Sequence, residues 1–172
     1  KLLEYELGNE VHAFSTMRAA GQSQDAYAHF NINPYCGDNP EHVAQNVNAL
    51  CHMLDIAPNN LVLPHQTHET TVRLVASELL SMPQEVRQMV LEGVDALITN
   101  VPGACIGVST ADCIPIILYD AEHRATAAIH AGWRGTVKRI AQNTIAQMRT
   151  AFGTNPQSLR AIIGPGISLH NF

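Results

Sequence analysis

The runs Ile114-Pro115-Ile116-Ile117-Leu118-Tyr119 and Thr126-Ala127-Ala128-Ile129 decide the fold. Both have the length of a β-strand, both are bounded by polar or turn-forming residues, and both are almost continuously apolar rather than alternating. A strand with that pattern is covered on both of its faces. We therefore predict a buried β-sheet around these two segments.

Further strands and three helices are predicted on either side of this pair. Asn39 is expected to cap a helix that starts at Pro40 and runs to Leu54, and Gly93 and Gly153 are expected to close helices over residues 83–92 and 137–152. The fold class that follows is α+β, with one or more buried mixed sheets flanked by helices. The other expected strands are residues 61–63, 72–75, 96–99, 105–108 and 161–163.

Length and composition narrow the class of protein. The 172 residues are 46% apolar, which fits one folded domain over residues 1–172. Ten basic against fifteen acidic side chains exclude a broad surface for nucleic acid. No run of eighteen apolar residues and no export signal occur, so we expect no membrane span and a cytoplasmic protein. The end of the sequence, shortly after Gly164-Pro165-Gly166, predicts a C-terminal segment beyond it.

Three polar clusters interrupt the apolar runs where the predicted strands end. Each cluster contains a histidine or cysteine, the side chains that zinc prefers, and one ligand from each would leave a fourth coordination position open. The separations from His68 to Cys113 and from Cys113 to His130 are unlike those of structural zinc ribbons. The alternative is a buried cysteine, a surface histidine and a core histidine bonded to backbone. The clusters are residues 64–69 (PHQTHE), 109–113 (STADC) and 129–135 (IHAGWRG).

The sequence resembles the YfiH/YlmD family, also called laccase-domain or polyphenol-oxidase-like proteins, a purine nucleoside phosphorylase family related to human FAMIN. The resemblance spans nearly the whole chain, and the hexapeptide that opens with His130, together with the tripeptide that ends with Cys113, is its most specific part. The matching segments are 13–16 (AFST), 37–41 (GDNPE), 66–68 (QTH), 94–99 (VDALIT), 109–115 (STADCIP), 130–135 (HAGWRG) and 163–167 (IGPGI).

The resemblance implies a YfiH-like fold of the cysteine-hydrolase type, in which His68, Cys113 and His130 bind zinc and carry out catalysis. It also implies a purine nucleoside enzyme that uses phosphate to cleave adenosine, inosine or methylthioadenosine, or that deaminates adenosine. The implied partners are the nucleoside and phosphate, and the oligomeric state stays open.

Three further residues are expected to bind substrate. Arg134 can present a planar fork to phosphate, or can orient its loop through an ion pair. Trp133 can stack on a purine, although a sole tryptophan is more often part of the core. Arg18 is carried over from the family as a phosphate or ribose contact, but this chain has Ala19-Ala20 where the family has paired glycines.

The neighbours of the candidate ligands are assigned lesser roles. Asp112 is expected to be structural or to support Cys113 from outside the coordination sphere. Glu69 is expected to be solvated, with proton transfer as the alternative. His65 is expected to face away from His68, because odd spacing on an extended segment reverses the direction of the side chain.

Three other functions remain open at the level of sequence. A multicopper oxidase needs repeated His-x-His pairs, and the sequence has none, although copper can bind an N/S site adventitiously. Cys113 and His130 could instead form the nucleophile and base of a thiol hydrolase, including one that edits peptidoglycan precursors. The third alternative is a metal-stabilised binding module without catalysis.

Overall fold

The computed structural model describes residues 1–171, and its largest sheet has five strands in the order β4-β5-β8-β7-β9. The antiparallel hairpin β7–β8 forms its centre, with Ile114 opposite Ala131 at one end and Asp120 opposite Ala125 at the other. The pair β4–β5 is parallel and the remaining pairs are antiparallel, so the predicted mixed sheet is confirmed. The strands are β4 (Val72–Leu74), β5 (Ala96–Thr99), β7 (Ile114–Asp120), β8 (Ala125–Ala131) and β9 (Arg160–Ile163).

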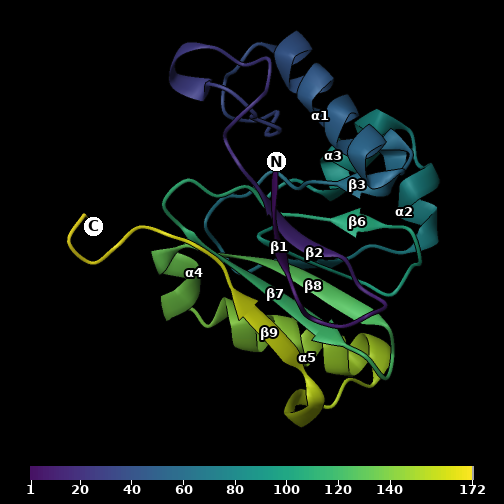
Figure 1. Ribbon diagram of the computed structural model, residues 1–172. Helices are drawn as coiled ribbons and strands as arrows, with labels where there is room; N and C mark the ends of the chain where they lie inside the picture. Colours follow the sequence, from purple (N-terminus) through teal and green to yellow (C-terminus); the bar gives the residue numbers. More distant parts are fainter. Residues whose placement is uncertain (172) are drawn as a thin grey trace.

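Helices cover one face of this sheet, and smaller sheets with further helices cover the other (Figure 1). The first face packs against α5 (Ile140–Phe152) through Ile140 and Met148. On the second face, buried Leu97 of β5 contacts the layer that holds α2, α3 and the β3–β6 pair. The remaining elements are β1 (Leu2–Tyr5), β2 (Ala13–Thr16), β3 (Leu61–Val62), β6 (Cys105–Ile106), α1 (Pro40–Leu54), α2 (Ser77–Ser81), α3 (Gln84–Val90) and α4 (Trp133–Val137).

Burial of the sheet is confirmed for β5 and β8, whereas the inner strand β7 buries only three of its seven residues and the edge strands are largely exposed. Every residue of β5 is buried, as are six of the seven residues of β8. The edge strands β4 and β9 expose most of their side chains, and Ile163 is 72% exposed. An edge strand has a neighbour on one side only, so an apolar pattern overestimates the burial of such a strand.

The capping and periodicity patterns of the sequence predicted α1 correctly but did not predict the break before α5. The Asn39 side chain accepts a hydrogen bond from the Glu41 backbone N–H at 2.9 Å, as a helix cap does. The predicted helix over residues 137–152 is instead two helices, because Arg139 adopts a left-handed conformation at φ 64°. Val137 therefore belongs to α4 and is 76% exposed. Gly153 closes α5 as expected, at φ 79°.

Two strands, β1 and β2, and two short helices, α2 and α4, were not predicted. The β1–β2 hairpin and α2 lack a long apolar run, and their burial comes from packing against the sheet and its loops. The predicted helix over residues 83–92 is α3, which ends at Val90. Among residues 1–171, no helix is both long and apolar enough to cross a membrane.

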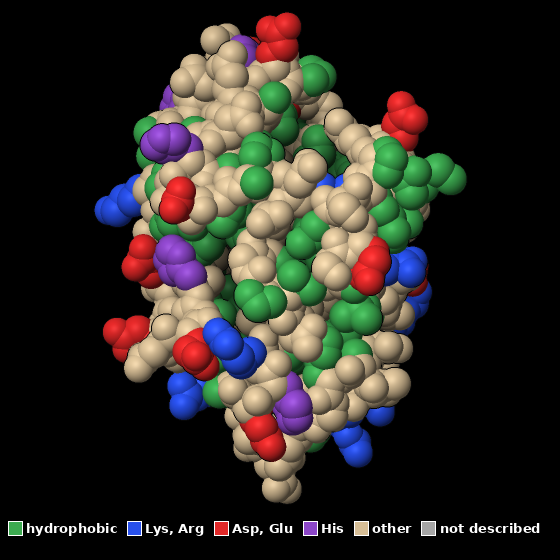
Figure 2. Space-filling view, turned by 90° about the vertical axis from the view of Figure 1, so that its right-hand side faces the viewer, with side chains coloured by type: hydrophobic (Ala, Val, Ile, Leu, Met, Phe, Trp, Pro, Cys, Tyr) green, Lys and Arg blue, Asp and Glu red, His purple; other side chains and the backbone are tan. Residues whose placement is uncertain are grey.

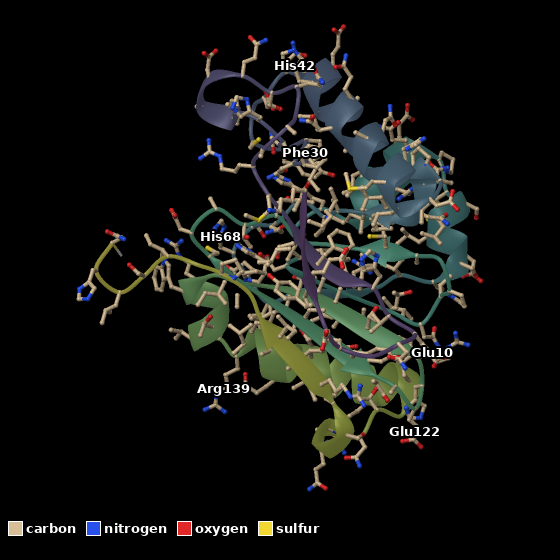
Figure 3. All side chains as sticks on the ribbon, in the orientation of Figure 1. Glu10, Phe30, His42, His68, Glu122 and Arg139 are labelled. Carbon is tan, nitrogen blue, oxygen red and sulfur yellow. The ribbon has the colours of Figure 1, made fainter. Side chains whose placement is uncertain are left out.

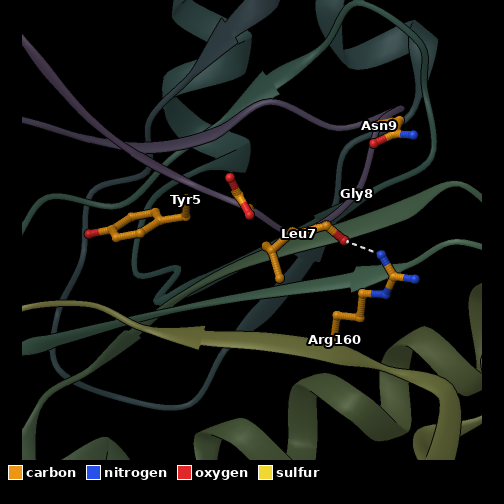
Figure 4. A pocket seen from close by; sticks show the side chains of 6 residues that line it. Tyr5, Leu7, Gly8, Asn9 and Arg160 are labelled. Atoms are coloured by element: carbon orange, nitrogen blue, oxygen red, sulfur yellow. Dashed lines mark hydrogen bonds between the residues drawn. The ribbon is translucent and has the colours of Figure 1, made fainter.

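The surface offers no strongly charged face in the view of Figure 2, where acidic and basic side chains are interspersed with hydrophobic patches. A shallow cavity of about 500 Å³ lies beside the β1–β2 connection. There Arg160 of β9 donates a hydrogen bond to the Leu7 carbonyl at 2.9 Å (Figure 4). The Arg160 guanidinium thus connects the N-terminal segment to the edge of the sheet. None of the candidate metal ligands His68, Cys113 and His130 lines this cavity.

Candidate metal centre

Cys113 and His130 lie at the same end of the central hairpin. His130 is the sixth residue of β8, and Cys113 directly precedes β7. Because β7 and β8 are antiparallel and pair Pro115 with His130, the start of β7 lies beside the end of β8. Cys113 is half-buried and His130 is 3% exposed. The backbone pairing of two inner strands therefore fixes two of the candidate ligands relative to each other.

The third candidate, His68, comes from the loop between β3 and β4 and is exposed. Its backbone is left-handed, with φ 63°, a conformation that costs a non-glycine residue about 1–3 kcal/mol. The buried carboxylate of Asp95 offsets this cost by accepting hydrogen bonds from three successive backbone N–H groups, those of Thr67, His68 and Glu69. The loop wraps around a carboxylate in the manner of a backbone nest around an anion.

The three candidate ligands converge on one point. The ligand atoms of His68, Cys113 and His130 all lie within 4.8 Å of one another. The two imidazole rings meet edge to face, with centroids 4.8 Å apart and an interplanar angle of 79°. Ligand atoms around a tetrahedral zinc ion stand about 3.3–3.7 Å apart, given its usual bond lengths. A contraction of about 1 Å would bring this set to coordination distance.

Gly132 gives the three side chains the space they need. A Cβ added at Gly132 would lie 3.2 Å from the Cys113 sulfur, 3.2 Å from Cδ2 of His68 and 3.6 Å from Cε1 of His130. A glycine is therefore required here for close approach rather than for its backbone angles, since its φ of −67° suits any residue. Two imidazoles and one thiol around such a cradle are a donor set that fits zinc.

Asp95 links two of the three ligands and was missed by the sequence analysis. Its Oδ1 is 2.8 Å from Nδ1 of His130, in addition to the hydrogen bonds it accepts from the loop around His68. Burial raises the pKa of this carboxyl, but the hydrogen bonds from His130, Glu69 and Thr67 outweigh burial and lower it. A signal was present: Asp95 is the lone charge within the otherwise apolar segment 94–98.

A second side chain joins the first loop to the loop before Cys113. The Gln66 amide nitrogen donates to the Ser109 carbonyl at 2.8 Å, and the Ser109 backbone N–H donates to the Gln66 amide oxygen at 2.7 Å. This reciprocal pair brings together residues 43 positions apart in the sequence. The three segments that carry the candidate ligands are thus connected by the amide of Gln66 and the carboxylate of Asp95.

The surroundings of Cys113 disfavour its thiolate form. Burial raises its pKa, and the carboxylates of Asp112 and Asp95 raise it further. A cysteine nucleophile requires the opposite shift, towards a stable thiolate. A metal ion held by Cys113 and the two histidines would supply positive charge here, because coordination deprotonates a thiol. The electrostatics favour a ligand over a metal-free nucleophile.

Trp133 and Arg134 follow the cradle directly, at the start of α4. Trp133 is 56% exposed, so the interpretation of the sole tryptophan as a core residue is wrong. The Arg134 guanidinium lies over the indole, 4.6 Å from the ring centroid. Arg134 makes no ion pair among the described residues, which removes the ion-pair interpretation for this side chain. Both side chains face solvent one and two positions after Gly132.

Other singled-out residues are engaged elsewhere. Arg18 donates to the Ala28 carbonyl from two guanidinium nitrogens, at 2.9 and 2.6 Å. His65 pairs with Glu92 at 2.8 Å, as expected for a side chain that does not support His68. Glu69 forms an ion pair with Lys138, at the end of α4, with both side chains about half exposed. This surface pair contributes about 0–1 kcal/mol.

The backbone at Ala20 and at Asp112 is relevant to the roles expected for Arg18 and Asp112. Ala20 takes a left-handed φ of 67°, the conformation that the family's glycine would adopt more easily. Asp112 is exposed, and its carbonyl accepts a hydrogen bond from the Ile167 N–H at 2.8 Å, which ties the segment after β9 to the loop before Cys113. The backbone of Asp112 is therefore structural. All four cysteines are free thiols.

Comparison with known proteins assigns this chain to a family. A family model described as multi-copper polyphenol oxidoreductase laccase matches residues 12–172, and the chain belongs to this family. The chain is 47% identical over 164 residues to a purine nucleoside phosphorylase of Bacteroides thetaiotaomicron, covering 95% of this chain and 61% of that protein. It is 38% identical over 157 residues to adenosine deaminase RL5 from an unknown prokaryotic organism, covering 91% of this chain and 60% of that protein.

Solved structures agree with the family assignment. The protein YfiH of Bacillus licheniformis superposes with a TM-score of 0.84 and 28% sequence identity, over 91% of this chain and 59% of that chain. The resemblance to the YfiH/YlmD family and the α+β fold class are therefore confirmed. The chain spans about three fifths of the length of the curated relatives that it matches. Although the family description names several copper ions, residues 1–171 assemble one cluster of three metal-ligating side chains, His68, Cys113 and His130.

Proposed function

We propose that this protein is a metal-dependent purine nucleoside phosphorylase, with His68, Cys113 and His130 holding one zinc ion at the catalytic centre. The observation that carries the proposal is the convergence of these three side chains within 4.8 Å in a chain that is 47% identical to a purine nucleoside phosphorylase. The substrates are a purine nucleoside, such as adenosine, inosine or methylthioadenosine, and inorganic phosphate.

The choice of zinc rests on the donors. Two imidazoles and one thiolate form a three-ligand set that leaves one tetrahedral position open, as in catalytic zinc sites. Copper binds N/S donors more tightly than zinc, so copper in a purified sample would not by itself identify the native ion. When bound, the ion supplies a Lewis acid that stabilises negative charge on the substrate.

The chain's own residues then account for binding and orientation. In phosphorolysis a phosphate oxygen forms a bond to C1′ of the ribose while the bond from C1′ to N9 breaks, and the departing purine takes the electron pair and a proton. Trp133 offers an exposed indole on which the purine can stack, and Arg134 offers a planar fork for phosphate. Arg18 is proposed as a contact to phosphate or ribose, which requires release of the Ala28 carbonyl.

Adenosine deamination is the second candidate, favoured by the relative that is named an adenosine deaminase. In that reaction water adds to C6 of the purine and the amino group leaves as ammonia, so protons must be moved near the base. Glu69 is the nearest carboxylate in sequence to His68, but its pairing with Lys138 directs it to α4. A hydrolase without metal is disfavoured by the raised pKa of Cys113.

The test is incubation of the full chain with adenosine, with and without phosphate, followed by chromatography of the products. The proposal predicts adenine and ribose 1-phosphate only when phosphate is present. Inosine and ammonia in both samples would assign deamination instead. Unchanged adenosine, inosine and methylthioadenosine in every sample would contradict both candidates.

A further inference from the structure

The carboxylate of Asp95 is placed to control two of the three candidate ligands at once. It is fully buried, and it lies immediately before β5, next to the end of β8 that carries His130. The His130 backbone N–H donates to the Asp95 carbonyl at 2.8 Å, so backbone and side chain both connect these two residues.

Both oxygens of this carboxylate are fully used. Oδ1 accepts from the His68 backbone N–H at 2.9 Å and contacts Nδ1 of His130 at 2.8 Å. Oδ2 accepts from the backbone N–H groups of Thr67 at 3.2 Å and Glu69 at 2.9 Å. Three of the four partners are obligate donors, an arrangement that suits a carboxylate, which is ionised at neutral pH and then only accepts hydrogen bonds.

The remaining partner is therefore a donor too. Nδ1 of His130 must carry the ring proton, and Nε2 is then left with a free lone pair, which is the form of imidazole that binds a metal ion. The same carboxylate stabilises the left-handed turn that points His68 towards the other two ligands.

We propose that Asp95 is the positioning residue of the metal centre: one carboxylate sets the tautomer of His130 and the conformation of the loop that presents His68. This inference rests on the proposed metal site and adds a residue that does not itself touch the ion. Outer partners of this kind typically change metal affinity by roughly 10–100-fold when they are removed.

The structure supplies a matched control at the other end of the sheet. Asp120 is also a buried carboxylate, it accepts from two backbone N–H groups, and it contacts Nδ1 of His123 at 2.8 Å. His123 belongs to no cluster of three metal-ligating side chains among the described residues. Asp95→Asn and Asp120→Asn therefore remove the same kind of interaction, once inside the proposed site and once outside it.

The experiment measures zinc affinity of the full chain by competition with a chromophoric chelator, for wild type and both variants. We expect Asp95→Asn to weaken zinc binding roughly 10–100-fold and Asp120→Asn to change it less than twofold. Equal affinity of wild type and Asp95→Asn would overturn the inference. A wild type that binds no zinc would overturn the proposed function as well, and the two failures are thus distinguished.

A second measurement does not depend on metal or on the folding of a variant. Nitrogen-15 shifts of the His130 ring in the metal-free wild type report which nitrogen carries the proton. The inference predicts a proton on Nδ1 in wild type, and in Asp95→Asn a shift towards the Nε2 form, because the amide can donate to Nδ1. A proton on Nε2 in the wild type would overturn the inference even if Asp95→Asn does not fold.

Discussion

The two ends of the central hairpin carry the same pair of side chains and differ in what surrounds them. Near the end of β8, His130 contacts buried Asp95, and in the turn between β7 and β8, His123 contacts buried Asp120, each at 2.8 Å. Figure 3 shows the two regions at opposite ends of the sheet, marked by His68 and by Glu122 next to His123. At about 3.3 Å per residue, the five residues from the start of β8 to His130 span roughly 17 Å.

The two histidines differ in their exposure to solvent and in the side chains that lie beside them. The His130 side chain is 3% exposed and faces His68 and Cys113 across a glycine. The His123 side chain is 31% exposed and stabilises a turn, with Asp120 also accepting from the Glu122 backbone N–H. A buried Asp–His pair is thus common to both regions, and what distinguishes the first is the convergence of His68, Cys113 and His130 from three parts of the chain.

Loss of a ligand should have the largest effect. His130→Ala or Cys113→Ser is expected to abolish both stoichiometric metal binding and turnover of the nucleoside. This effect exceeds the roughly 10–100-fold loss of metal affinity expected when Asp95, which does not touch the ion, is replaced. His123→Ala should keep both. Metal content and product formation, measured on the same preparations, check the contrast. Full turnover by metal-free Cys113→Ser would show that the His130 region is not the catalytic centre.

Removal of the metal should lower the free energy of unfolding, and this loss should depend on the region around His130 and not on the region around His123. An ion at 100 times its dissociation constant stabilises the folded state by about 2.7 kcal/mol. For a chain of this size that corresponds to about 5–10 °C in Tm. Calorimetry with zinc and after chelation should show this shift in wild type and His123→Ala, and should show none in Cys113→Ser. A shift of equal size in Cys113→Ser would place the stabilising ion elsewhere.

Two glycine substitutions should separate stability from metal binding. Gly132→Ala keeps a permitted backbone, φ −67°, but places a methyl group against all three ligands. Gly153→Ala puts a side chain at φ 79° near His123, at a cost of about 1–2 kcal/mol. We expect weaker zinc binding with nearly normal stability for Gly132→Ala, and the reverse for Gly153→Ala. Denaturant unfolding and chelator competition test this pairing, and parallel changes in both variants would contradict it.

The smallest effect concerns the thiols outside the site. Burial, with a further contribution from Cys51, raises the pKa of Cys105 to about 11, so about one molecule in a thousand carries its thiolate at pH 8. Because the thiolate is the form that reacts, a raised thiol pKa slows alkylation until the pH approaches the pKa. Mass spectrometry should find exposed Cys36 modified first and Cys105 last, with Cys113 protected by bound metal. Modification of Cys105 as fast as Cys36 would contradict the raised pKa of Cys105.

Sequence reasoning singled out the three side chains that the structure brings together, but not the side chain that connects them. Cys113 and His130 stand in short motifs at the ends of strongly apolar strands, and strand pairing brings such ends together. Asp95 was missed because its importance comes from four donors that arrive from other parts of the chain, which local patterns do not encode. The break at Arg139 was missed for a related reason: the helical period of the apolar residues continues across it while the backbone does not.

The most direct test of the central claim is X-ray absorption spectroscopy, with metal analysis, on the full chain loaded with zinc. We expect about one zinc ion per chain, with one sulfur and two imidazole nitrogens in its first coordination shell, at about 2.3 Å and 2.0–2.1 Å. The sulfur scattering should disappear in Cys113→Ser. A zinc ion without sulfur in its shell, or a wild-type protein that holds no metal, would contradict the account.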